Sequence, residues 1–367
     1  MVLYETKRKF TDLPLKTKTI ENNDDSSEIV SKDRNFNNFE EHDSIDVLFA
    51  SDNNFSPYLG VAIYSFLKNN SSDFKKIRMH ILDKEISEEN KKILTKITND
   101  FECGELIFIK DKGISELLGK KVYGNRALSS FSRLFSASFL DKSIKKVLYL
   151  DADALILNSF KELWQTDIAD YYCAGVLDVG PDYVKTAVGL SKDVKYINAG
   201  VLLINLEKWR NENIESKFID FLEKHDMVVY NNDQGIINAV LNEKILIIHP
   251  KFNLMSPFLE KEYGEVVRWN GLKNYYSKEI IEEALENPVF LHFVHFINGR
   301  PWFKNTKHPC KNLYMKYAGE TPYKNDVLVD DYRGFRYKFF FSLTKFLPFR
   351  VVTWIYKIYR DFLIKYF

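Results

Sequence analysis

Residues 146–157 (KVLYLDADALIL) form an apolar run that two carboxylates interrupt, one residue apart. Such a run, with β-branched and aromatic members, predicts a strand buried on both faces. A carboxylate that leaves water must be paired, hydrogen-bonded or bound to a cation. Residues i and i+2 of an extended chain point to the same side, so Asp151 and Asp153 can reach one metal ion together. A strand-end cap beside an ordinary surface acid fits the same short pattern, so the context must decide.

Composition and charge narrow the class of protein. The 367 residues suffice for a large core, and a hydrophobic content of 45% is typical of globular chains. The formal net charge of +1 argues against a nucleic-acid partner. Three scattered cysteines without CxxC spacing predict reduced thiols in the cytoplasm. We expect no secretory signal in the first 30 residues and no membrane-spanning helix, because no apolar run is long enough.

The chain divides into three segments of different composition. Residues 1–43 are polar and predicted to be disordered, because they bury too little to offset their ordering entropy. Residues 44–322 alternate predicted strands with helices, which indicates one α/β domain with a mostly parallel sheet and helices on both faces. The predicted strands include residues 45–50, 77–82, 105–109, 146–150, 173–178 and 196–205. Residues 323–367, called the tail below, are basic, aromatic and predicted to be helical.

Six motifs of this α/β domain resemble those of the retaining nucleotide-sugar glycosyltransferases, a family that includes glycogenin and the bacterial lipopolysaccharide galactosyl- and glucosyltransferases. They occur in the family's order: FASDNNF at 49–55, Arg133 in a predicted helix over 129–140, LYLDAD at 148–153, YINAGVLLIN at 196–205, NDQG at 232–235, and RPW at 300–302 after a histidine. One such motif is weak, whereas six in order are specific. The resemblance implies a Rossmann-like domain of the A type that binds a UDP-sugar at the C-terminal edge of its sheet.

The same resemblance implies a metal site. Asp151 and Asp153 would bind Mn²⁺ or Mg²⁺, which neutralises the charge that develops on the UDP leaving group. The third ligand is His292 or His295: the strand pattern favours the first, and the spacing to the Arg-Pro-Trp signature favours the second. Family members usually carry Lys before Pro-Trp, so Arg300 is a departure that keeps the positive charge but replaces a point charge by a bidentate fork.

Further residues match family positions around the donor. Those implied to hold the uracil, ribose, phosphates or sugar are Ala50, Asp52, Asn54, Arg133, Ala152, Asn198, Ala199 and Arg300. Three others are implied to lie at the reacting centre: Asp178, Asp233 and Gln234. The family lacks an agreed carboxylate nucleophile of the glycosidase kind, so we expect front-face transfer from UDP-galactose or UDP-glucose, with the Gln234 amide near the anomeric carbon.

The tail interleaves cations with aromatic residues, a composition typical of segments that lie on anionic membranes. The residues concerned are Arg333, Arg336, Lys338, Lys345, Arg350, Lys357, Arg360 and Lys365, with Phe339, Phe340, Phe341, Phe346, Phe349, Trp354, Tyr356 and Phe362. We therefore expect a peripheral protein on the inner face of the cell membrane, close to a glycan or lipid-linked acceptor. A helix packed on the catalytic domain or on another subunit is the alternative. Acceptor contacts are expected within residues 254–287.

Two other functions use the same residues. An aspartyl-phosphate phosphatase would use Asp151 as nucleophile and Asp153 as acid and base, but its motif continues to Thr or Val where this chain has Leu155. An inactive, membrane-associated scaffold on the same fold needs no chemistry at all. Metal-dependent hydrolysis of a UDP-sugar distinguishes the transferase from both.

Overall fold

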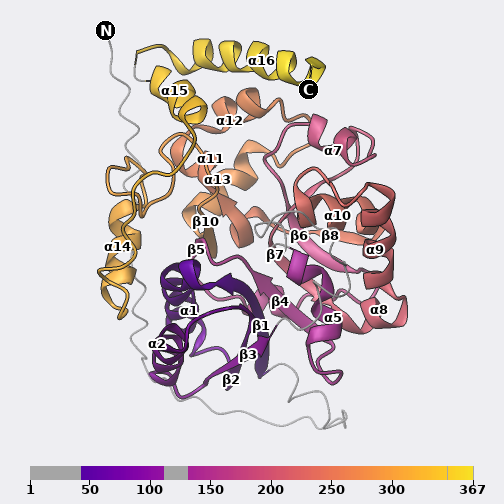
Figure 1. The fold of residues 1–367 in the computed structure, drawn as a ribbon, viewed down its shortest axis with the longest axis vertical. Coiled ribbons are helices and arrows are strands. Elements are labelled where there is room, and N and C mark those ends of the chain that lie inside the picture. The colour runs from indigo at the N-terminus through magenta and orange to yellow at the C-terminus, as the bar shows by residue number, and fades with distance from the viewer. Residues whose placement is uncertain (1–42, 111–130, 345, 367) are drawn as a thin grey trace, which may run out of the picture.

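The computed structural model describes residues 43–110, 131–344 and 346–366, so nearly all of the segment predicted to be disordered lies outside it. A seven-stranded sheet in the order β3-β2-β1-β4-β7-β6-β8 forms its centre (Figure 1). The strands are β1 (Ser44–Asp52), β2 (Lys76–Lys84), β3 (Gly104–Lys110), β4 (Lys146–Leu150), β6 (Cys173–Leu177), β7 (Ile197–Asn205) and β8 (Ile245–Ile247). Within it β7 runs antiparallel to both neighbours, and the other pairs are parallel. The mostly parallel α/β fold is therefore confirmed.

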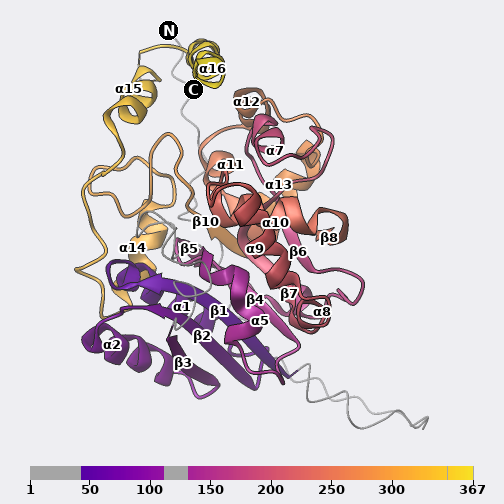
Figure 2. The ribbon, with the colours of Figure 1, turned by 45° about the vertical axis from the view of Figure 1, so that its right-hand side comes forward.

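Helices cover both faces of this sheet (Figure 2). One face packs against α1 (Ser56–Asn70) and α2 (Glu88–Asn99). The other packs against α8 (Leu206–Asn211), α9 (Ile214–Lys224) and α10 (Asn232–Leu241). Successive residues of β4 enter different cores: Leu148 belongs to the first and Tyr149 to the second, and both are buried. Because side chains alternate across a strand, a strand covered on both faces is apolar throughout.

A small second sheet brings distant parts of the chain to the end of β4. It has the order β5-β10-β9 and consists of β5 (Ala154–Ile156), β9 (Leu254–Met255) and β10 (Phe290–His292). The chain leaves β4, passes through Asp151 and Asp153, and enters β5 in this sheet. His292 pairs with Ala154 in the antiparallel ladder of β10 and β5. The register of this ladder places a late histidine directly beside the two acids.

The remaining helices have nine residues or fewer, except for α16, which has 18. They are α5 (Ser136–Phe139), α6 (Lys161–Trp164), α7 (Tyr183–Ala187), α11 (Ser256–Glu260), α12 (Tyr263–Asn270), α13 (Lys278–Glu286), α14 (Lys311–Gly319), α15 (Phe335–Leu343) and α16 (Phe349–Tyr366). Single 3₁₀ turns lie at Asn53–Phe55, Ser132–Phe135, Asn242–Lys244 and Pro250–Asn253. Within the described part of the helix predicted over 129–140, the 3₁₀ turn Ser132–Phe135 is followed by one α turn, and residues 129 and 130 lie outside the described residues. Among the helices of the described residues, none combines the length and apolar character that crossing a bilayer requires.

The tail packs against the α/β domain in two places. Tyr323 and Val327 are buried in the core, and Tyr323 lies against Gly60 of α1. Further on, α15 and α16 cover α12 at one end of the molecule (Figures 1 and 2). The centre of that contact is Trp269 of α12, whose ring stacks on Tyr356 with centroids 4.5 Å apart. Helical packing on the domain, the alternative to membrane docking, therefore occurs on one face of the tail.

Candidate active site

Asp151, Asp153 and His292, called the carboxylate-histidine cluster below, converge at the C-terminal end of β4. The Nε2 atom of His292 lies 3.2 Å from Oδ1 of Asp153 and 3.7 Å from Oδ2 of Asp151. One ligand atom from each residue lies within 4.8 Å of the other two. Two carboxylates and an imidazole suit Mn²⁺ or Mg²⁺ better than a thiolate-seeking ion. The residues present therefore fit a small divalent cation.

The second carboxylate oxygen of each clustered acid forms an ion pair with an arginine. Oδ1 of Asp151 lies 2.9 Å from Nη2 of Arg133, and Oδ2 of Asp153 lies 2.6 Å from Nη2 of Arg300. The guanidinium of Arg300 also lies 5.7 Å from the ring centre of Phe55, in the loop that follows β1. The two cations thus turn the free oxygens of both carboxylates toward the histidine.

Arg133 lies in the 3₁₀ turn Ser132–Phe135, and its side chain has close partners on several sides. The guanidinium pairs with Asp151 and Asp233, donates to the carbonyl oxygen of Ala199 at 2.8 Å, and lies 4.2 Å over the ring of Tyr149. Burial lowers the pKa of Arg133, but the neighbouring carboxylates outweigh it and hold the pKa well above its ordinary value. Arg133 is therefore a permanent buried cation whose position the surrounding side chains fix.

The surroundings of the site shift the pKa values of its acids in different directions. Burial raises the pKa of Asp153, but Arg300 and His292 outweigh burial and hold it well below its usual range. Burial lowers the pKa of His292, and the charges of the two clustered acids reverse this to a net rise. Burial raises the pKa of Asp233 to about 6, and it raises the pKa of Asp178 as well. Asp153 is thus held as a carboxylate more firmly than Asp178 or Asp233.

The residues predicted to surround the donor sugar form one hydrogen-bonded group. Oε1 of Gln234, in the first turn of α10, accepts from the backbone N–H of Ala199 and from Nδ2 of Asn198, both at 3.1 Å. The same Nδ2 donates to Oδ1 of Asp178 at 3.0 Å. Asp233, the neighbour of Gln234, turns toward Arg133 instead. The structure therefore joins the sugar-side residues to those of the carboxylate-histidine cluster.

The residues predicted to hold the uracil and ribose lie at the same edge of the sheet. Ala50 and Asp52 end β1, which is parallel to β4 with Leu48 opposite Tyr149. Oδ1 of Asp52 accepts from the backbone N–H of Phe55 at 3.0 Å, so a local cap also accounts for this acid. Asn54 is exposed. Ala152, between the two clustered acids, is buried.

His295 lies outside the cluster. Its ring packs against Phe303 and Tyr332, with centroid distances of 6.1 and 5.8 Å. Burial lowers the pKa of His295 to about 4. Of the two histidines that the sequence offers as the third ligand, His292 is the one beside both acids.

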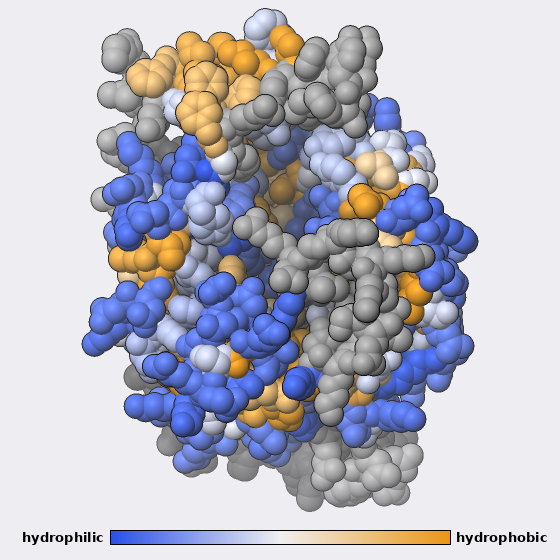
Figure 3. All heavy atoms as spheres, in the orientation of Figure 1, coloured by the Kyte–Doolittle hydropathy of each residue, from blue (hydrophilic) through white to orange (hydrophobic). Residues whose placement is uncertain are grey.

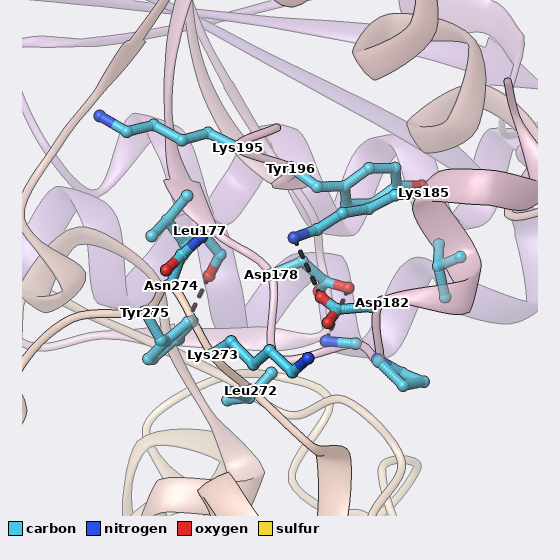
Figure 4. Close-up of a pocket in the computed structure, with 13 residues that line it drawn as sticks. Leu177, Asp178, Asp182, Lys185, Lys195, Tyr196, Leu272, Lys273, Asn274 and Tyr275 are labelled. Atoms are coloured by element: carbon cyan, nitrogen blue, oxygen red, sulfur yellow. Dashed lines mark hydrogen bonds and ion pairs between the residues drawn. The ribbon is translucent and has the colours of Figure 1, made fainter. Parts of the chain in front are cut away.

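A cavity opens beside Asp178 (Figure 4). One wall includes the start of α7, where Nζ of Lys185 lies 3.1 Å from Oδ1 of Asp182. The opposite wall is formed by residues 272–275, and the Tyr275 hydroxyl donates to the carbonyl oxygen of Leu177 at 3.2 Å. Part of the segment expected to contact the acceptor thus lies next to the residues expected to hold the sugar.

Sequence reasoning missed two residues that shape the site. Gly200 of β7 lies under the ring of His292: a Cβ there would lie 2.3 Å from Cε1 of the histidine. Asn253 ends a 3₁₀ turn and accepts from Nδ1 of His292 at 2.9 Å. Gly200 lies inside the motif at 196–205 and Asn253 lies in none, but the role of each arises from a contact that only the folded chain makes.

The mostly parallel sheet with helices on both faces is the fold of the A-type glycosyltransferases, such as the galactosyltransferase LgtC. The chain belongs to glycosyl transferase family 8, whose family model matches residues 46–306. The predicted family is thereby confirmed.

The chain is similar to curated proteins over about half of its length. It is 35% identical over 185 residues to General stress protein A of Bacillus subtilis (strain 168), covering 49% of this chain and 61% of that protein. It is 26% identical over 214 residues to the lipopolysaccharide 1,3-galactosyltransferase of Salmonella typhimurium (strain LT2), covering 56% and 58%. The chain thus spans about three fifths of the length of these relatives.

Solved structures agree on the fold. The galactosyltransferase LgtC, crystallised with donor and acceptor sugar analogs, matches with a TM-score of 0.62 at 25% identity, covering 76% of this chain and 96% of that one. The bifunctional glycosyltransferase WbbM matches with a TM-score of 0.64 at 18% identity, covering 78% and 51%, which supports the fold alone.

Proposed function

We propose that this protein is a metal-dependent, retaining hexosyltransferase that moves galactose or glucose from a UDP-sugar to a hydroxyl of a glycan or glycolipid. The observation that carries the proposal is the convergence of Asp151, Asp153 and His292 between the two arginines. The curated relatives include a lipopolysaccharide galactosyltransferase and lipopolysaccharide glucosyltransferases, which supports a hexose donor and a cell-surface glycan as acceptor.

The carboxylate-histidine cluster would hold Mn²⁺ or Mg²⁺. Such an ion, when bound, neutralises charge on the diphosphate and so makes UDP a better leaving group. Arg300, between Asp153 and the loop after β1, is placed to bind an oxyanion of the same group through its guanidinium fork. We keep His292 as the third ligand and assign His295 to the aromatic packing around Phe303.

Transfer would occur on one face of the sugar. The acceptor hydroxyl attacks the anomeric carbon from the side that UDP leaves, and its proton passes to the departing phosphate oxygen. Gln234, Asn198 and Asp178 form the hydrogen-bonded surface on which the sugar hydroxyls would rest. The amide and carboxylate groups suit a hexose, because its hydroxyls both donate and accept.

The acceptor would approach over the cavity beside Asp178. Residues 272–275 line one wall of this cavity and bring polar groups, among them Lys273 and Asn274, to its rim. They belong to the segment in which acceptor contacts were expected. Their position next to the sugar-side residues supports that assignment.

The tail would place the enzyme on an anionic membrane surface. Apolar residues gather over α15 and α16 at one end of the molecule (Figure 3). The side chains of Phe335 and Phe346 are each 82% exposed, and that of Trp354 is 64% exposed. Residues 335–358 contain five cations and no acid. Exposed aromatic groups flanked only by positive charge suit the interface of anionic lipids.

Hydrolysis of a panel of UDP-sugars by the purified protein, with and without Mn²⁺, tests the proposed activity. We expect UDP release from UDP-galactose or UDP-glucose that stops when the metal is chelated. Hydrolysis of phosphomonoesters alone would identify a phosphatase instead. No turnover of any donor in the presence of Mn²⁺ would identify a scaffold.

A further inference from the structure

We infer that Asn253 is a positioning residue that fixes the ring of His292 and ties it to the amides on the sugar side of the site. The inference rests on the proposed function and deepens it. Asn253 is fully buried in the 3₁₀ turn Pro250–Asn253. It immediately precedes β9, in which Met255 pairs with His292 of β10. The fold thus delivers this side chain to the back of the metal-binding ring.

A backbone group sets the direction of the hydrogen bonds. The N–H of Gly200 donates to Oδ1 of Asn198 at 3.0 Å, and a backbone N–H can only donate. The oxygen of the Asn198 amide must therefore face Gly200. The same oxygen lies 2.9 Å from the amide nitrogen of Asn253, which consequently has to be the donor.

The direction of this bond decides the state of His292. With its nitrogen committed to Asn198, Asn253 turns its oxygen toward Nδ1 of His292, 2.9 Å away. That oxygen has no proton to give, so Nδ1 must carry the hydrogen. The lone pair used for metal binding then lies on Nε2, the nitrogen that faces Asp153 and Asp151.

The bonds continue in the opposite direction toward the donor sugar. With its oxygen facing Gly200, Asn198 directs its nitrogen to Asp178 and to Oε1 of Gln234. The backbone N–H of Ala199 donates to that Oε1 as well and fixes the Gln234 amide in the same sense. Asn253 therefore belongs to one continuous set of bonds that connects the metal ligand with the sugar-side residues.

Two substitutions separate the two contacts of Asn253. Alanine removes both. In Asn253→Asp, one carboxylate oxygen still accepts from His292, but the other oxygen faces the oxygen of Asn198 and cannot donate to it. Asn198 cannot turn over in response, because Gly200 requires its oxygen. The aspartate variant thus keeps the metal-side contact and breaks the sugar-side contact.

The experiment measures Mn²⁺ affinity in the presence of UDP by electron paramagnetic resonance, kcat for UDP-sugar hydrolysis, and the unfolding temperature. Asn253→Ala should weaken Mn²⁺ binding roughly 10- to 100-fold. Asn253→Asp should bind Mn²⁺ with an affinity within about threefold of that of the unmodified protein, while kcat falls about tenfold or more.

The matched control is Asn70→Asp. Asn70 is equally buried, and its amide bonds only the backbone of Phe66 and Phe160 among the described residues.

Three results would overturn the inference: unchanged Mn²⁺ affinity in Asn253→Ala, an equal loss of affinity in both Asn253 variants, or the same kcat loss in Asn70→Asp. If Asn253→Ala does not fold, the comparison of Asn253→Asp with Asn70→Asp still decides. The two Asn253 variants could differ in Mn²⁺ affinity as expected although the unmodified protein hydrolyses no UDP-sugar. This result would support the role of Asn253 and refute the proposed function.

Discussion

The edge of the sheet and the C-terminal end of the molecule are organised in opposite ways. At the edge, charged and amide groups from β4, β7 and β10 satisfy one another, and Arg133, Asp153 and His292 all lie among close partners. At the C-terminal end, Phe346 and Trp354 expose aromatic surface. Under the proposed function the edge carries the chemistry and the tail the membrane contact, so changes in one should leave the other intact.

The largest effect is expected at the carboxylate-histidine cluster. Asp153→Asn, or Asp151→Asn, removes a charge from the proposed metal site. The first also takes the carboxylate away from Arg300, whereas in the second Arg133 keeps Asp233. We expect UDP release to fall roughly 1,000-fold, measured as metal-dependent hydrolysis, with membrane binding unchanged. Asp100→Asn, an exposed acid after α2, is the control. Full activity in both cluster variants would refute the metal assignment.

A smaller effect is expected from Arg133→Lys. The ammonium keeps the charge but cannot contact Asp151, Asp233 and the carbonyl of Ala199 together, as the guanidinium does. We expect kcat/KM for the UDP-sugar to fall about 10- to 100-fold. An unchanged value in steady-state kinetics would mean that charge alone matters at this position.

The tail variants test the other side of the comparison. Phe346→Ser combined with Trp354→Ser removes two exposed rings without opening the core, and flotation with vesicles containing phosphatidylglycerol should fall at least about tenfold. UDP-sugar hydrolysis in solution should stay the same. Val228→Ser, 79% exposed at a distant loop, is the matched control. Equal flotation of all variants would refute membrane docking. Truncation after Asp330 tests the same idea but also uncovers Trp269.

The smallest effect concerns Glu260, which lies between the two regions. Burial, only partly offset by the hydrogen bonds from Asn298 and by the charge of Arg333, raises the pKa of Glu260 from its ordinary 4.5 to about 8. Between pH 4.5 and pH 8, Glu260 loses its proton in the unfolded chain but keeps it in the folded chain. The free energy of unfolding therefore falls as pH rises through this range. The backbone N–H and the side-chain amide of Asn298 both donate to Oε2 of Glu260. The amide oxygen of a glutamine at this position can accept the same two hydrogen bonds.

Glu260→Gln should therefore stabilise the fold more above pH 8 than near pH 5. Urea unfolding at the two pH values measures the difference. A pH-independent difference would show that Glu260 does not titrate in this range.

The sequence predicts what depends on local pattern. Apolar runs locate the strands, and Asp151 and Asp153 follow a buried strand closely enough to share one ion. The choice between His292 and His295 depends on the ladder of β5 and β10, which joins segments more than 130 residues apart. The proposed role of Asn253 is harder still to predict from the sequence, because it arises from contacts with two residues distant in the chain, Asn198 and His292. The sequence also does not predict the buried ion pairs of Arg133 with Asp151 and Asp233, because they join segments distant in the chain.

The most direct test of the central claim is titration calorimetry of UDP with the purified protein. Binding should be strong with Mn²⁺, weaken at least about tenfold without it, and lose its dependence on Mn²⁺ in Asp151→Asn and Asp153→Asn. UDP that binds the unmodified protein equally well with and without Mn²⁺ would contradict a metal held by these two acids.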